Sequence, residues 1–101
     1  MGRQMFDQYS LLHAATGIIA YFWGMSRRTF MLVHIVFELF ENTSVGMRLI
    51  NIIPFWPGGK SYADSFINSM IGDNIAALIG HVVAQILDEH GSRAGWFERH
   101  I

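Results

Sequence analysis

The sequence predicts an all-α membrane protein with about three transmembrane helices and a re-entrant or interfacial segment between the second and the third. Composition is the first reason, because 51% of the residues are hydrophobic and only 15% are charged, against roughly 25% in an average soluble domain. The mean hydropathy is +0.29. The second reason is that the charged residues are bunched and leave long apolar intervals. A small soluble globule needs more polar surface than this chain offers, so we expect one helical membrane domain over 1–101.

The first helix is expected at roughly 9–25. No Asp, Glu, Lys or Arg occurs from Gln8 to Ser26, and a helix that crosses a bilayer needs about 20 predominantly apolar residues. His13 and Thr16 are almost the only polar side chains over most of this stretch. A helix without a polar face is either buried or in lipid.

The second and third helices are expected at roughly 28–42 and 64–88. The second is shorter and contains Glu38, while Asp73 is the only charge between Ser65 and Leu87. Short apolar helices also form the cores of soluble proteins, so a compact soluble three-helix protein is the alternative. A chain of 101 residues is too small to bury three such helices completely, which favours the membrane.

Residues 43–63 are expected to form an interfacial loop, and 89–101 a polar tail. Pro54 and Pro57 interrupt regular structure in the loop, and Phe55 and Trp56 suit the headgroup depth of a bilayer. The distribution of Lys and Arg between the two sides favours a C-terminus on the cytoplasmic side.

Ionisable side chains are frequent inside these apolar segments. Each costs roughly 2.5 to 3.5 kcal/mol on insertion scales, so such groups usually face the protein interior and have partners. His34, Glu38 and Asn42 are spaced i, i+4, i+8 and share one helical face. The polar positions predicted to gather inside the membrane are His13, His34, Glu38, Glu41, Asn42, Asp64, Ser65, Asn68 and Asp73.

This intramembrane cluster has two interpretations. Its side chains form interhelical hydrogen bonds that fix the packing, or they form a site that binds a divalent cation, relays protons or acts on a lipid-linked substrate. Gly72, Ala76 and Gly80 are spaced four apart and support the packing interpretation, because small residues let helices approach closely.

No catalytic residue, metal ligand or cofactor is assigned from the sequence. Metalloprotease and nucleophile-elbow motifs are missing from it, and two histidines of unknown proximity make a poor case for zinc. The chain has no cysteine, so disulfides and thiol chemistry are excluded. A net charge of −1 excludes the basic surface that nucleic-acid binding needs.

Several blocks of the sequence occur together in a known family. They are D-x-Y-S-x-x-H at Asp7–His13, F-E-L-F-E-N-T at Phe37–Thr43 and A-D-S-x-x-N-S-x-x-x-D at Ala63–Asp73. In this order they resemble a bacterial family of uncharacterised integral membrane proteins, a domain-of-unknown-function group loosely similar to VanZ-like proteins. The W-P-G-G-K segment at Trp56–Lys60 looks instead like small membrane proteins of large double-stranded DNA viruses.

The resemblance implies a multi-pass helical protein of the membrane, and its viral part implies the inner membrane of a virion. The expected function is that of a structural or assembly subunit in a larger membrane complex, whose partners are the lipid bilayer and other protein subunits. A VanZ-like protein that binds or acts on a lipid or an ion at the Glu/Asp/His cluster is the alternative.

Overall fold

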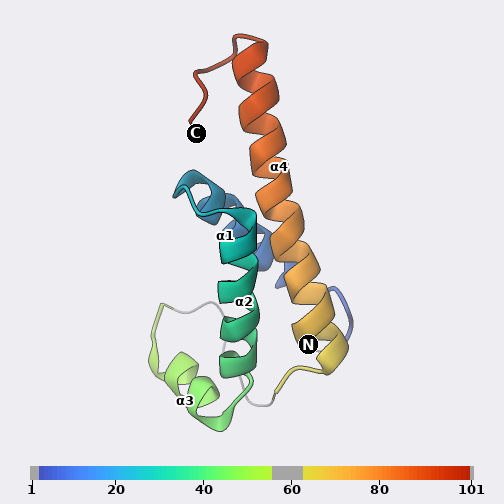
Figure 1. Ribbon diagram of the computed structural model, residues 1–101. Helices are drawn as coiled ribbons and strands as arrows, with labels where there is room; N and C mark the ends of the chain where they lie inside the picture. Colours follow the sequence, from blue (N-terminus) through green and yellow to red (C-terminus); the bar gives the residue numbers. More distant parts are fainter. Residues whose placement is uncertain (1–2, 56–62, 101) are drawn as a thin grey trace.

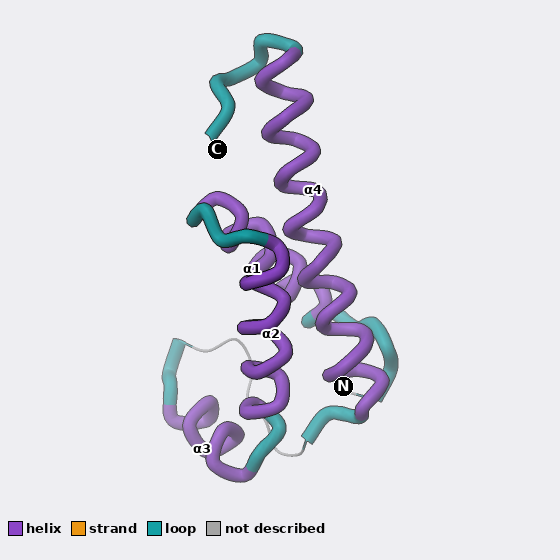
Figure 2. The backbone as a smooth tube through the Cα atoms, in the orientation of Figure 1, coloured by secondary structure: helices purple, strands orange, loops and turns teal. Residues whose placement is uncertain are grey.

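The computed structural model describes residues 3–55 and 63–100 and is all-α over these ranges, without a strand among them (Figures 1 and 2). The predicted fold class is confirmed at this level. The molecule is elongated, 47 × 25 × 22 Å. Its elements are α1 (Ser10–Phe22), α2 (Arg27–Glu41), α3 (Ser44–Ile52), the π-helical η1 (Ile67–Gly72) and α4 (Asp73–Arg93). The W-P-G-G-K segment lies outside the described residues.

A tight turn joins α1 to α2 and returns the chain along α4 (Figure 1). Gly24 adopts a φ of +83° in this turn, a conformation that glycine takes without a steric penalty. Ser26 then caps α2, because its hydroxyl accepts a hydrogen bond of 3.2 Å from the backbone N–H of Thr29. The capped turn sets the direction of α2 and therefore where His34 and Glu38 lie.

Helix α3 occupies residues 44–52 of the segment 43–63, which was expected to form an interfacial loop. Thr43 begins this helix, accepting a hydrogen bond of 3.1 Å from the N–H of Gly46. The helix ends at Ile52, just before Pro54, which cannot continue it. Pro54 predicts a loop, but it comes after the nine-residue helix-forming stretch and does not interrupt it.

The η1 and α4 segments form one continuous helix from Ile67 to Arg93. It extends beyond the expected end at Leu87 or Asp88, which corrects the start of the predicted polar tail. His90 and Arg93 occupy the last turn, where positive charge is favourable beside the helix dipole. This is the one helix of the described chain that is long and apolar enough to cross a membrane.

Helices α1 and α4 touch through their backbones. A Cβ on Gly17 would overlap the carbonyl oxygen of Ala77, and a Cβ on Gly80 would overlap that of Ala14. Gly72 lies equally close to the backbone of the N-terminal segment at Met5. Because only glycine permits these approaches, the small residues of η1 and α4 fix the position of α1.

The interior of the described chain is rich in polar side chains, and many large apolar side chains lie on its surface. The largest fully buried side chains are Glu38 and Asp88, and most buried hydrophobic residues are alanines. Large apolar side chains lie outside instead, including Leu11 (76% exposed), Val36 (65%) and Ile79 (52%). This is the reverse of the usual distribution in soluble proteins.

Candidate functional site

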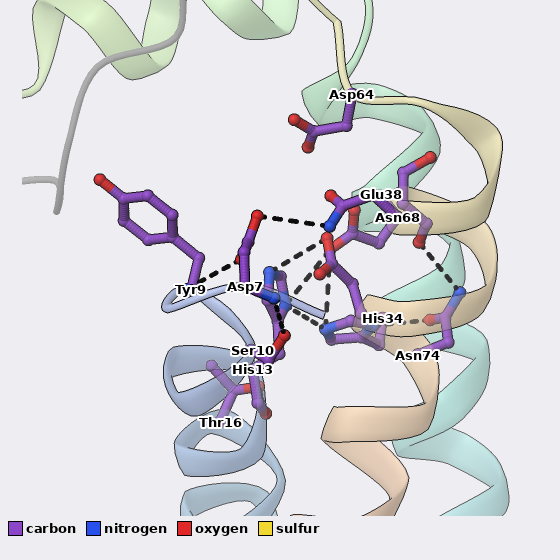
Figure 3. Close-up of polar contacts among 12 residues, drawn as sticks. Asp7, Tyr9, Ser10, His13, Thr16, His34, Glu38, Asp64, Asn68 and Asn74 are labelled. Atoms are coloured by element: carbon purple, nitrogen blue, oxygen red, sulfur yellow. Dashed lines mark hydrogen bonds and ion pairs between the residues drawn. The ribbon is translucent and has the colours of Figure 1, made fainter. Parts of the chain in front are cut away.

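Three helices bring a buried polar cluster together near the start of α4 (Figure 3). His13 comes from α1, His34 and Glu38 from α2, and Asp73 from the first residue of α4. His13 lies between the two carboxylates, with its Nδ1 3.3 Å from Glu38 Oε1 and its Nε2 3.2 Å from Asp73 Oδ2. The two histidines, 21 residues apart, approach to 3.0 Å between His13 Nδ1 and His34 Nε2.

Asn74 determines which nitrogen of His34 carries the proton. The amide nitrogen of Asn74 donates a 2.9 Å hydrogen bond to the carbonyl of Met70, which orients its amide oxygen toward the cluster. That oxygen lies 2.7 Å from His34 Nδ1, so Nδ1 must be the donor. In neutral His34 the lone pair is therefore on Nε2, which faces His13 and Glu38.

Glu38 is fully buried and poorly compensated. Its exposed fraction is 0%, and neither of its carboxylate oxygens accepts a hydrogen bond from any described residue. Its ion-pair contacts within the described ranges are with His13 at 3.3 Å and His34 at 3.9 Å. A buried carboxylate with so few donors is energetically costly unless it is protonated or binds a cation.

Asp64 adds a third carboxylate beside Glu38 and Asp73. One oxygen from each of these side chains lies within 4.8 Å of the other two. Asn42 holds this arrangement at both ends: its Nδ2 donates to the carbonyl of Glu38, and its Oδ1 accepts from the N–H of Asp64, both at 2.8 Å. Asn42 is thus a positioning residue that ties the end of α2 to the segment before η1.

The other predicted site residues lie around the cluster. Asn68 donates to the carbonyl of Gln4 at 2.8 Å, and Ser65 donates to that of Arg3 at 3.3 Å. These bonds fasten the N-terminal segment over η1. Glu41 lies half-buried at the last position of α2.

The π-helical turn of η1 joins Asn68 to Asp73, two buried residues that contact the N-terminal segment and His13 respectively. The N–H of Asp73 donates to the carbonyl of Asn68, five residues earlier. In a regular α-helix residues five apart point in different directions. π-turns are frequent at functional sites.

A second buried network in the upper half of α4 was not among the predicted site residues. Tyr21 donates a 2.6 Å hydrogen bond to Asp88 Oδ2, and the N–H of His100 donates to Asp88 Oδ1 at 2.9 Å. His81 bonds to the carbonyl of Met25 at 2.9 Å. The sequence did not predict this pair, because Tyr21 has apolar neighbours in the sequence and Asp88 is followed by charged and polar ones.

No family model matches the chain, and no curated protein or solved structure is significantly similar to it. The resemblance to VanZ-like and viral membrane proteins therefore stays a prediction.

Proposed function

We propose that this is an integral membrane protein in which α1, α2 and the η1–α4 helix enclose a cation-binding site. One observation carries the proposal: among the described residues eight polar or ionisable side chains are buried, against seven hydrophobic ones that are mostly alanines, while many large apolar side chains are exposed. Exposed apolar area is unfavourable in water by about 25 cal/mol per Å². Lipid removes that cost, and it also accounts for ionisable groups that face inward.

The dimensions support embedding in a bilayer. The η1–α4 helix has 27 residues and rises about 40 Å at about 1.5 Å per residue, which exceeds the roughly 30 Å hydrocarbon core. Helices α1 and α2, with 13 and 15 residues, rise only about 20 Å. In the proposed arrangement they lie beside α4 inside the bilayer, and their ends reach the interface through the turns.

The chain has no cysteine, so single cysteines report membrane burial without background. We expect Val36→Cys and Ile79→Cys to resist a water-soluble maleimide in membranes opened on both sides and to react once detergent is added. Arg28→Cys, at the exposed start of α2, is the control and should react in both conditions. Equal labelling of all three variants in membranes would exclude the proposed embedding.

The cation site is tested by thermal unfolding of the purified full chain in mild detergent. A ligand at 100 times its Kd stabilises the folded state by about 2.7 kcal/mol. At least one of Mg²⁺, Ca²⁺, Mn²⁺ and Zn²⁺ should raise the Tm of the wild-type protein, and the rise should vanish in Glu38→Gln. The proposed cation site is wrong if none of the four ions raises the wild-type Tm.

A role as a subunit of a larger membrane assembly is the second candidate. Helix α3 favours it, because Val45, Leu49 and Ile52 form an exposed apolar stripe at i, i+4, i+7 spacing. A partner subunit would cover this stripe. Particle mass after extraction from the native membrane in mild detergent distinguishes a complex of fixed composition from a lone small oligomer.

A further inference from the structure

We infer that the cluster is a site for a divalent transition-metal ion, bound by His13 Nδ1, His34 Nε2 and the carboxylate of Glu38. This inference deepens the proposed cation site and rests on it. The three ligand atoms belong to two helices and converge at one point (Figure 3). No short motif in the sequence joins them.

The spacing of the three atoms suits a metal ion. They are separated by 3.0 Å (His13 Nδ1 to His34 Nε2), 3.3 Å (His13 Nδ1 to Glu38 Oε1) and 3.9 Å (His34 Nε2 to Glu38 Oε1). Metal–ligand bonds of about 2.1 Å place neighbouring ligands about 3.4 Å apart in a tetrahedral site and about 3.0 Å apart in an octahedral one. An ion fits among these atoms with only small side-chain adjustments.

Each histidine is also held from its far side, as metal-binding histidines usually are. His34 donates its Nδ1 proton to Asn74 Oδ1 at 2.7 Å, which leaves Nε2 for the metal. His13 has its Nε2 3.2 Å from Asp73 Oδ2, so a proton on Nε2 leaves Nδ1 for the metal. Asp73 and Asn74 are adjacent residues of α4, and each orients one ring as a positioning residue.

The third ligand is the most deeply buried carboxyl group of the cluster. Glu38 is fully buried, and its two oxygens accept no hydrogen bond within the described ranges. A metal ion would supply the missing charge compensation, which hydrogen bonds provide for most buried carboxylates.

The donor set defines the class of ion. Two imidazole nitrogens and one carboxylate oxygen suit Zn²⁺, Fe²⁺, Co²⁺ or Mn²⁺, whereas Mg²⁺ and Ca²⁺ prefer oxygen ligands alone. Three protein ligands leave at least one coordination position for water or another small ligand, as in open rather than closed metal sites.

The test uses the full chain in detergent, stripped with chelator and titrated with Co²⁺ or Zn²⁺ alone. We expect one ion per chain and ligand-field absorption bands from bound Co²⁺. His34→Ala and Glu38→Gln should weaken binding at least 100-fold, and Asn74→Ala 10- to 100-fold. His90→Ala, an exposed histidine outside the cluster, is the matched control and should bind like the wild type.

A second measurement on the wild-type chain avoids the risk that a variant fails to fold. Zn²⁺ should shift the ring ¹⁵N resonances of two of the five histidines, and these should be His13 and His34. Failure of the folded wild type to bind either ion, or equal binding by folded Glu38→Gln, would overturn the inference. Stabilisation by Mg²⁺ or Ca²⁺ alone that requires Glu38 would overturn it too, but would leave the proposed cation site standing.

Discussion

At the scale of single residues, the molecule is organised around side chains whose partners come from distant parts of the sequence. The i, i+4 spacing of His34 and Glu38 was sufficient to place them on one face, and both are buried. The contact between His13 and His34 follows from helix packing, which a spacing of 21 residues does not encode. The hydrogen bond from His34 to Asn74 likewise joins residues 40 apart.

The hydrogen bond of Tyr21 is expected to stabilise the fold. Its hydroxyl donates to the buried Asp88 at 2.6 Å, and removing a donor from a buried charged acceptor costs about 1 to 3 kcal/mol. Tyr21→Phe should therefore lower the free energy of unfolding by about that amount, measured by thermal or denaturant unfolding in detergent. Tyr9→Phe, on a tyrosine for which the described chain shows no hydroxyl hydrogen bond, serves as the control. Equal stability of Tyr21→Phe and wild type would show that the bond contributes nothing.

At the scale of elements, helix positions were easier to predict than helix ends. The apolar intervals located α1, α2 and α4, because they depend on local composition. Helix α3 and the extension of α4 to Arg93 were not predicted, since nine residues are too few for hydropathy to distinguish a helix from an interfacial segment and the last turns of α4 are polar. The π-turn of η1 was not predicted either; within the same helix, the side chain of Asn74 bonds to the carbonyl of Met70, four residues earlier.

The close contact between α1 and α4 should not tolerate a larger side chain. A side chain at Gly80 would collide with the backbone carbonyl of Ala14, and backbone cannot move aside as a flexible side chain does. Gly80→Val should cost about 3 kcal/mol or more and abolish the folded form in detergent, measured by Tm and by elution volume. Ile79→Val, at the adjacent exposed position, should behave like the wild type. A folded Gly80→Val protein with an unchanged Tm would contradict the close contact.

At the scale of the whole molecule, the distribution of apolar residues is more informative about the protein's environment than any sequence motif. An ordinary soluble protein of this size would place its large aliphatic side chains inside, whereas Leu11, Val36 and Ile79 are on the surface. Composition alone predicts an apolar surface, because only 15% of the residues are charged. In the proposed membrane protein, the number of helices inside the bilayer depends on tilt and depth, which composition does not specify.

A charge placed on the apolar outer surface should impair membrane insertion. Ile79 is near the middle of the Ile67–Arg93 helix, where a lysine costs about 2.5 to 3.5 kcal/mol on insertion scales. Ile79→Lys should reduce the fraction of chains recovered in the membrane, measured by alkaline extraction. Trp96→Lys, at an exposed position beyond the end of the helix, should have little effect. If Ile79→Lys is recovered like the wild type, Ile79 is not in contact with lipid.

The origin of the cluster in three separate helices has a mechanical consequence. An ion bound by His13, His34 and Glu38 would act as a reversible cross-link between α1 and α2, which Asp73 and Asn74 hold to α4 through the two histidines. Cross-links that close long stretches of chain remove much of the freedom of the unfolded state. Amide hydrogen exchange in α1 should then slow when the ion binds. Occupancy of one small site would in this way set how firmly the helices are held together.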